Sequence, residues 1–380
     1  MRIGIPRETA AGETRVAATP ETVKKLKAQG HTLLVESAAG LAAAVTDEAY
    51  AAAGAEIVDT RAAFGAPLVL KVRGPVNGEH ALMQPGTALV GMLNPFDRPG
   101  LQALADARLT AFALEAAPRT TRAQSMDVLS SQANVAGYKA VMLAADVYQR
   151  FIPMLMTAAG TVKAARVVIL GVGVAGLQAI ATAKRLGAVI EASDVRPSVK
   201  EQVESLGAKF IDVPCETAEE REAAEGTGGY ARELTTEEKA KQQEILDRHI
   251  AKADAVITTA AIPGRTAPRI ISKSAVAAMG AGAVIVDLAA ESGGNCELTV
   301  AGETVVTPNG VKILGPRNLP SELARHASQM YARNLLNFLA PAIKKGELAI
   351  DWQDEVFAQS VLTHDGQVKH APTAKLVEAR

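Results

Sequence analysis

The chain has 380 residues, with 40 lysines and arginines against 41 aspartates and glutamates, and a formal net charge of −1. This balance excludes the basic face of a nucleic-acid-binding domain, and no apolar run approaches the roughly 18 residues that span a bilayer. The two cysteines, Cys215 and Cys296, lack the spacing of a metal site and are predicted to be free thiols. Because Met1 leads directly into a predicted strand, we expect no signal peptide, and any association with a membrane goes through a partner.

The first third of the chain alternates predicted strands and helices. A helix is expected over residues 20–29, with Thr19 as its N-cap and Gly30 closing it, and another opens at Thr46. Strands are expected at residues 2–5, 32–36, 68–72, 88–92 and 109–114. Such alternation predicts a mostly parallel sheet with helices on its faces.

A glycine-rich segment lies in the middle of the chain, between a predicted strand and a predicted helix. The strand is residues 166–170, and the segment is Gly171-Val172-Gly173-Val174-Ala175-Gly176. In the dinucleotide-binding fingerprint the first glycine permits a tight turn, the second lets the backbone approach a pyrophosphate, and the third lets the helix pack close to the strand. The free N–H groups at the start of the helix then attract the phosphates.

A second strand, residues 188–193, ends at Asp194, which lies 21 residues after Gly173. That spacing is typical of the acidic residue that binds the ribose hydroxyls of NAD. The alternative is a Rossmann-like domain whose site is degenerate and empty. We predict an NAD(H) site, to which this domain contributes Gly171, Gly173, Val174, Ala175, Gly176, Asp194, Val195, Arg196, Thr259 and Ala260.

Further predicted strands at residues 209–212, 254–259, 283–287 and 311–315 complete this second domain. Residues 130–151 are expected to form a helix that links the domains, and residues 319–344 form another, interrupted at Pro341. We expect the end of the chain to return to the first domain. The predicted fold is α/β, with two Rossmann-like doubly wound domains, the first discontinuous, and a nucleotide cleft between them. Their expected bounds are residues 1–130 with 320–380, and residues 131–319.

Residues 213–236 have few apolar side chains, a charged run and several glycines. The capping-box spacing of Thr235 and Glu238 predicts that a helix restarts there. Tyr230, next to Gly229, is the only aromatic residue of the segment. Two interpretations fit this composition equally: a lid that folds Tyr230 over a bound cofactor, and a solvated loop with an incidental tyrosine.

Residues 119–132, just before the linking helix, are rich in side chains that hydrogen-bond a carboxamide, a ribose or a phosphate. They form either part of the binding site or a polar loop in which Ser130 or Ser131 caps the helix. Hydride transfer between two nicotinamides needs neither a general acid nor a metal, only orientation and exclusion of water. The six histidines are scattered, and none follows a predicted strand beside a matching cation. We therefore predict that the histidines are structural or on the surface, and that there is no metal site.

Several of these segments together resemble the alanine dehydrogenase / proton-translocating nicotinamide nucleotide transhydrogenase family, over nearly the whole chain. The family-wide likeness rests on the first 20 residues, on Lys71-Val-Arg, on the glycine loop and on residues 286–295. Residues 122–132, 156–160 and 228–231 are similar to the transhydrogenase branch, in the short form of its NAD(H)-binding alpha subunit that lacks membrane helices.

The resemblance also separates this chain from alanine dehydrogenases. Arg15, which grips pyruvate in those enzymes, is retained. Arg73 stands in place of their substrate-binding lysine, Asn94 in place of their catalytic histidine, and Glu291 in place of their catalytic aspartate. Without that imidazole, amino-acid redox chemistry is not expected.

The resemblance implies roles and partners. Gln124 would bond the nicotinamide carboxamide or ribose, and Arg119, Asp127 and Ser130 would position the dihydronicotinamide. Asp194 would hold the adenosine ribose, and Tyr230, beside Gly229, would be the tip of the lid. The expected protein is a cytoplasmic homodimer, attached peripherally to the inner membrane through an NADP(H)-binding beta subunit and a proton-channel subunit. It would pass hydride directly from NADH to NADP⁺ on the partner, with Si-specific stereochemistry.

Two other functions remain open from the sequence. A stand-alone alanine-type dehydrogenase would turn over pyruvate, ammonia and NADH by itself. A non-catalytic NAD-binding module would bind the nucleotide without turnover in any mixture.

Overall fold

The structure is a computed structural model that describes residues 1–212, 236–261, 264–344 and 346–370. The chain divides into two compact units, Met1–Gln132 with Pro320–Arg380 (unit 1) and Ala133–Leu319 (unit 2). Each is built on a parallel-dominated sheet, which confirms the predicted α/β class. The two units are described separately.

Unit 1 holds a sheet in the order β19-β18-β6-β5-β4-β1-β2-β3. Strands β1 to β6 are parallel, and their order around β1 and β4 is that of a doubly wound fold. The chain returns through β18, which pairs antiparallel with β6 at Val361 and Phe112. The strands are β1 Arg2–Ile5, β2 Thr32–Glu36, β3 Glu56–Val58, β4 Leu68–Arg73, β5 Ala88–Met92, β6 Thr110–Ala113, β18 Val361–His364 and β19 Gln367–Val368.

The helices of unit 1 follow their local signals. Helix α1 begins at Pro20 behind the Thr19 cap, whose backbone N–H donates to the hydroxyl of Thr22. The expected helix over 319–344 is shorter, because α11 stops two residues before Pro341. The helices are α1 Pro20–Ala28, α2 Asp47–Ala53, α3 Thr60–Phe64, α4 Arg98–Asp106, α11 Ala324–Leu339 and α12 Glu355–Ser360, with 3-10 turns η1 Leu41–Ala43, η2 Glu79–Leu82, η3 Leu114–Ala116, η4 Thr121–Met126 and η7 Leu319–Leu323.

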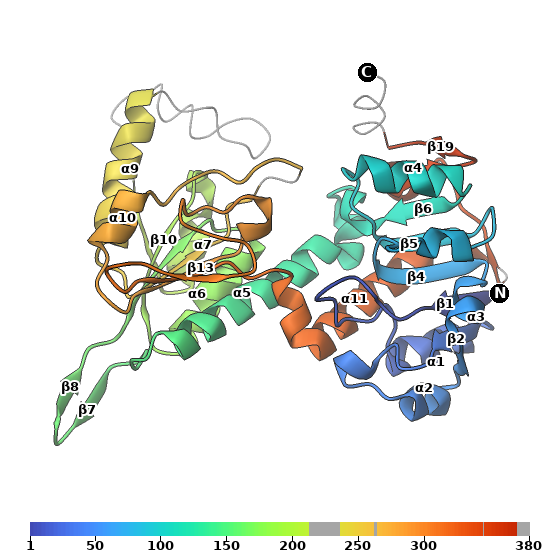
Figure 1. Cartoon of the computed structure of the whole chain (residues 1–380), viewed down its shortest axis with the longest axis horizontal. Coiled ribbons are helices and arrows are strands. Elements are labelled where there is room, and N and C mark those ends of the chain that lie inside the picture. Colours follow the sequence, from blue (N-terminus) through green and yellow to red (C-terminus); the bar gives the residue numbers. More distant parts are fainter. Residues whose placement is uncertain (213–235, 262–263, 345, 371–380) are drawn as a thin grey trace. The chain divides into compact units, whose positions relative to one another are not determined.

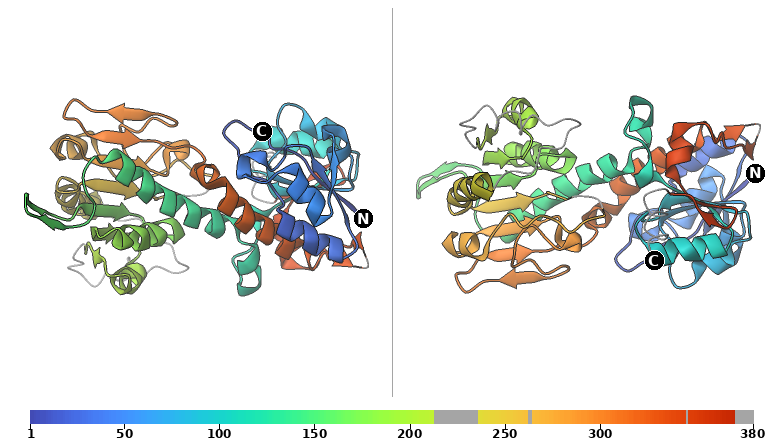
Figure 2. Two further views of the ribbon diagram at one scale, coloured as in Figure 1. Left: turned by 90° about the horizontal axis from the view of Figure 1, so that it is seen from below. Right: turned by 90° about the horizontal axis from the view of Figure 1, so that it is seen from above.

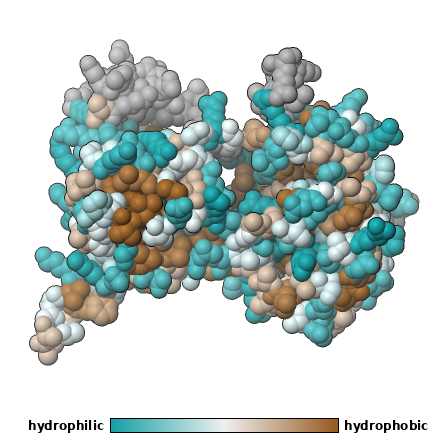
Figure 3. All heavy atoms as spheres, viewed as in Figure 1, coloured by the Kyte–Doolittle hydropathy of each residue, from teal (hydrophilic) through white to brown (hydrophobic). Residues whose placement is uncertain are grey.

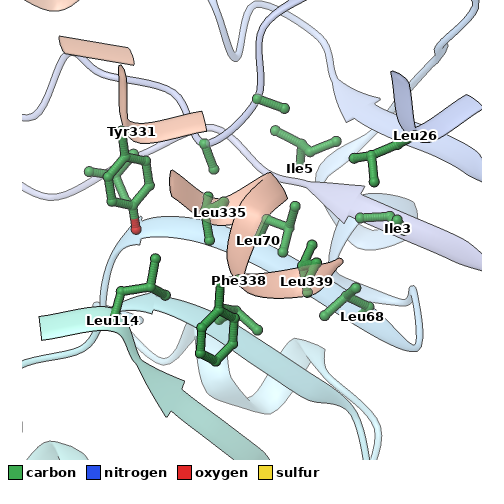
Figure 4. Packing of buried hydrophobic residues seen from close by; sticks show 14 of the residues in the cluster. Ile3, Ile5, Leu26, Leu68, Leu70, Leu114, Tyr331, Leu335, Phe338 and Leu339 are labelled. Carbon is green, nitrogen blue, oxygen red and sulfur yellow. The ribbon is translucent and has the colours of Figure 1, made fainter. Parts of the chain in front are cut away.

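The core of unit 1 lies between its sheet and α11 (Figure 4). Four buried residues of α11 repeat at helical spacing and therefore share one face: Tyr331, Leu335, Phe338 and Leu339. They meet the side chains of β1 and β4, among them Ile3, Ile5, Leu68 and Leu70. This packing fixes α11 against the centre of the sheet.

Unit 2 has the sheet order β11-β10-β9-β12-β13-β15-β14, in which only β14 runs antiparallel. Its first five strands again follow the doubly wound order, with the switch point between β9 and β12. Alternate residues of β9 face opposite layers: Val167 and Ile169 one, Val168 and Leu170 the other. The strands are β9 Arg166–Leu170, β10 Val189–Ser193, β11 Lys209–Phe210, β12 Ala255–Thr258, β13 Val284–Asp287, β14 Thr304–Val306 and β15 Lys312–Leu314.

The helices of unit 2 include the expected linking helix and one that begins where the capping-box signal placed it. The linking helix, α5, spans Val128–Val147 rather than residues 130–151, and α9 begins at Thr236. A hairpin of β7 Leu155–Thr157 and β8 Gly160–Val162 projects from the unit (Figures 1 and 2). The helices are α5, α6 Val174–Arg185, α7 Lys200–Ser205, α9 Thr236–Ile250 and α10 Lys273–Ala278, with η5 Pro197–Val199 and η6 Ala290–Ser292, and a second small hairpin, β16 Ile343–Lys344 with β17 Glu347–Leu348, belongs to unit 1.

Candidate nucleotide-binding site

The glycine loop of unit 2 has a different steric reason for each glycine. Gly171 adopts a φ of 93°, and a Cβ there would lie 2.7 Å from the hydroxyl of Thr259. A Cβ on Gly176 would lie 2.0 Å from the carbonyl oxygen of Gly171, so α6 can pack this close only with glycine. A Cβ on Gly173 would meet nothing within 4 Å. The loop therefore leaves open space at Gly173, where the fingerprint requires a pyrophosphate to approach.

The start of α6 offers the second element of an anion site. Gly173 is its N-cap residue, and no side-chain hydrogen bond caps the helix. Its first-turn N–H groups belong to Val174, Ala175 and Gly176, and an α-helix gives such groups no internal partner. They are accordingly suited to phosphate oxygens.

Asp194 follows β10 and lies against this loop. One carboxylate oxygen accepts from the backbone N–H of Val172 at 2.7 Å, and the guanidinium of Arg196 donates to both oxygens at 2.9 and 3.0 Å. Burial alone would raise the pKa of Asp194, but the bonds from Arg196 and Val172 outweigh it and hold the pKa below its usual value. Asp194 is thus ionised at neutral pH and suited to accept from ribose hydroxyls. Val195, between them, is exposed.

The end of β12 closes the opposite side of the loop. The Thr259 hydroxyl donates to the carbonyl of Gly171 at 2.8 Å. The next residue, Ala260, is held through both backbone groups by the amide of fully buried Asn295, at 3.1 and 2.8 Å. Asn295 is fixed in turn, because its backbone N–H donates to the buried carboxylate of Asp287.

Two positions that support the loop were missed by sequence reasoning. Asn295 appeared only within a family-like stretch, and its partner Ala260 lies 35 residues away. Gly137 of α5 is the other, because a Cβ there would lie 2.1 Å from the carbonyl oxygen of Ala175. A glycine inside a predicted helix is the one signal that pointed to such a close approach.

The polar segment before α5 lies in unit 1. Gln124 in η4 is exposed, as is Arg119, and the Gln124 side chain makes no hydrogen bond within the described ranges. Asp127 accepts from the backbone N–H of Ser130 at 2.9 Å and from its hydroxyl at 2.5 Å. Because α5 begins at Val128, the capping residue is Asp127, and the expectation of a cap at Ser130 or Ser131 was wrong.

The predicted site residues thus form two groups, each within one unit. Unit 2 brings together the glycine loop, Asp194 to Arg196, Thr259 and Ala260 at the carboxyl edge of β9, β10 and β12. Unit 1 carries Arg119, Gln124, Asp127 and Ser130. Gly229 and Tyr230 lie outside the described residues. No group of His, Cys, Asp or Glu among the residues that the structure describes is placed to hold a metal ion.

The position of the alanine-dehydrogenase site is filled by internal ion pairs. The buried guanidinium of Arg15 binds both oxygens of Glu13 at 2.7 Å, and Arg73 binds the same carboxylate at 3.1 Å. Asn94 presents an amide, and its backbone N–H donates to Glu115 at 2.7 Å. Burial raises the pKa of Glu115 to about 7, against hydrogen bonds from the backbone and the charge of Arg73.

The fold and the glycine loop define a Rossmann-type α/β protein, and comparison with known families specifies it further. The family described as "Alanine dehydrogenase/PNT, N-terminal domain" matches residues 4–136, and "Alanine dehydrogenase/PNT, C-terminal domain" matches residues 140–371. The chain therefore belongs to the alanine dehydrogenase/PNT family.

Similar proteins fall in both branches of this family. The first of the chains that make up the NAD(P) transhydrogenase subunit alpha of Rhodospirillum rubrum is 49% identical, over 97% of this chain and 98% of its own. The alanine dehydrogenase of Methanococcus maripaludis is 28% identical, over 99% and 96%. A crystal structure of transhydrogenase from Sinorhizobium meliloti superposes with a TM-score of 0.88 at 46% identity, covering 97% of this chain and 100% of that one. An L-alanine dehydrogenase gives 0.81 at 26%, covering 100% and 99%.

Proposed function

We propose that this chain is the NAD(H)-binding component of a proton-translocating NAD(P) transhydrogenase. The observation that carries the proposal is the full-length likeness to a chain of a transhydrogenase subunit alpha, at 49% identity against 28% for an alanine dehydrogenase. Asn94 supports it, since an amide cannot serve as the proton-transfer group that amino-acid oxidation needs.

Unit 2 would bind the adenosine and pyrophosphate of NADH. The space at Gly173 and the uncapped start of α6 fit a pyrophosphate, and the ionised carboxylate of Asp194 fits the ribose hydroxyls. Thr259 and Ala260 would line the loop on its other side. When bound, NADH supplies the hydride that is transferred.

The 119–130 segment would hold the reacting end of the nucleotide. Gln124 has a carboxamide free to pair with the carboxamide or ribose of the dihydronicotinamide. Asp127, Ser130 and Arg119 would complete its position. Since hydride moves directly between two rings, the residues of this segment would orient the ring and exclude water, and none would transfer a proton. In this proposal Tyr230, with Gly229, forms the tip of a lid over the cofactor.

The proposed partners are an NADP(H)-binding beta subunit and a membrane subunit that conducts protons, through which the chain would be attached to the inner membrane from the cytoplasm. Within the described ranges no helix is long and apolar enough to cross a bilayer, which agrees with a membrane role delegated to a partner.

We also propose that the chain forms a homodimer. The β7–β8 hairpin exposes apolar side chains: Met154 is 58% and Met156 76% exposed. Figure 3 shows apolar residues along this projection. Methionine-rich exposed surfaces of this kind mark protein contacts. The second copy of the chain is the occupant that the family resemblance implies, and sedimentation of wild type against Met154→Ser/Met156→Ser tests it.

The proposal is tested by mixing the pure chain with NADH, an NADP⁺ analogue and an NADP-binding partner domain. We expect transfer only when the partner domain is present. Turnover of pyruvate, ammonia and NADH by the chain alone would instead favour the alanine-type dehydrogenase, and binding without transfer in every mixture would favour a non-catalytic module. The same assay with NADH labelled on either face of its ring reads the stereochemistry.

A further inference from the structure

The polar segment of unit 1 is attached to α11 by side-chain amides. Asn334 and Asn337, one turn apart on α11, both donate to the backbone carbonyl of Ser125, at 2.9 and 3.0 Å. Ser125 directly follows Gln124 in η4. Two amide donors on one carbonyl are unusual for an irregular segment, and they locate the backbone next to the Gln124 side chain.

Asn334 also reaches the far end of the segment. Its side-chain oxygen accepts from the hydroxyl of Ser131 at 2.7 Å, in the first turn of α5. One amide therefore bridges Ser125 and Ser131, and the residues between them include Asp127 and Ser130. Asn334 is only 8% exposed, so both bonds are shielded from competing water.

The base of this bridge is rigid. Leu335 and Phe338, which flank Asn334 and Asn337 on α11, are buried in the core of unit 1. The helix cannot shift without disturbing that packing. A second tether, the ion pair of Arg122 with Asp354, holds the start of η4 from the outside. That pair is largely exposed at Arg122 and contributes less than the buried amide.

We propose that Asn334 is a positioning residue for hydride transfer. It sets the distance between the Ser125 carbonyl and the first turn of α5, and so fixes the backbone that presents Gln124, Asp127 and Ser130. This inference rests on the proposed function, because it assigns the segment to the reacting end of NADH. It predicts a loss in the transfer rate rather than in NADH affinity, since the adenosine and pyrophosphate contacts are placed in unit 2.

The test is Asn334→Leu, which keeps a similar volume and removes both hydrogen bonds. Reconstituted with the partner domain at saturating nucleotide, it should transfer hydride about ten-fold or more slower, because errors of about 1 Å in orientation cost on the order of 100-fold. The NADH dissociation constant should change by less than about three-fold, as expected for an interaction made only in the transition state. Amide hydrogen exchange at residues 125–131 should accelerate, a readout that needs no activity.

Leu335→Ala is the matched control, because it weakens the neighbouring position of α11 without touching the segment. It should lower stability yet keep the wild-type transfer rate and the wild-type exchange at 125–131. Ser131→Ala removes one of the two bonds from the other side and should slow transfer in the same direction, even if the Asn334 variant does not fold.

A folded Asn334→Leu protein with the wild-type transfer rate would overturn the inference, as would equal rate losses in Asn334→Leu and Leu335→Ala. These results are distinct from failure of the proposed function, in which wild type itself shows no transfer with its partner.

Discussion

The carboxylate of Asp194 accepts a 2.7 Å hydrogen bond from the backbone N–H of Val172, so the end of β10 is joined directly to the glycine loop. Arg196 binds the same carboxylate through its backbone N–H and its guanidinium. These four donors leave little acceptor capacity on Asp194. A ribose that binds here must replace at least one bond from the guanidinium.

This geometry predicts how the chain discriminates between nucleotides. We expect NADH to bind more tightly than NADPH, because the 2′-phosphate would face the negative charge of Asp194. Arg196→Ala should sharpen the preference by about ten-fold, since it removes a cation near the phosphate and frees the carboxylate for ribose. Isothermal calorimetry with both nucleotides measures this. Equal or tighter binding of NADPH by wild type would contradict it.

Gln124→Asn should slow hydride transfer far more than it weakens NADH binding. Shortening the side chain by one methylene lets the ring drift while the contacts of unit 2 stay intact, and a misplacement of about 1 Å costs on the order of 100-fold in rate. The rate is compared with wild type at saturating nucleotide in the presence of the partner domain. Gln102→Asn, on the exposed face of α4, is a control with the same chemical change. An unchanged rate would remove Gln124 from the mechanism.

Glu115 should make the stability of unit 1 fall as pH rises. Its pKa is raised to about 7 by burial, so the folded state holds a proton that the unfolded state releases in the usual glutamate range. Stability is therefore full below that range and is lost progressively up to about pH 7. Glu115→Gln should lack this loss and gain in urea midpoint over wild type at about pH 8 but not at about pH 4.

The control for this titration is Glu56→Gln, at an exposed position of β3. Its difference from wild type should be small and similar at both pH values. A Glu115→Gln difference that is the same at both would show that this carboxyl does not titrate with a raised pKa.

The isolated chain should not act as an alanine dehydrogenase. Asn94 offers no imidazole, and Glu13 already neutralises both Arg15 and Arg73. We expect no oxidation of NADH when pyruvate and ammonia are added to the pure protein, measured by absorbance beside an authentic alanine dehydrogenase. Robust oxidation would refute this interpretation of the ion pairs.

The sequence predicted those elements of the fold that depend on local signals. The α1 start at Pro20, the long strands of both sheets and the glycine loop each follow from periodicity, caps or turn chemistry. The three-residue strands β7 and β8 were missed, because so few residues carry no readable alternation. The cap at Asp127 was missed because serines on the helix side offered the same chemistry.

The contacts of the site that depend on distant residues could not be read from the sequence. Asn334 meets Ser131 across 203 positions, and Ala260 meets Asn295 across 35. Such contacts arise from how α11 and the β12 edge pack, which periodicity alone does not encode. The ion pairs of Glu13 were invisible for another reason: a glutamate and an arginine two residues apart ordinarily face solvent.

The most direct test of direct hydride transfer follows a deuterium label. NADH carrying deuterium at the transferred position of C4 is mixed with the chain, the NADP-binding partner domain and NADP⁺ in ordinary water, and the NADPH formed is analysed by mass spectrometry. The account predicts that the deuterium appears in NADPH without dilution by solvent protons, and only when both proteins are present. Unlabelled NADPH, or labelled NADPH formed without this chain, would contradict it.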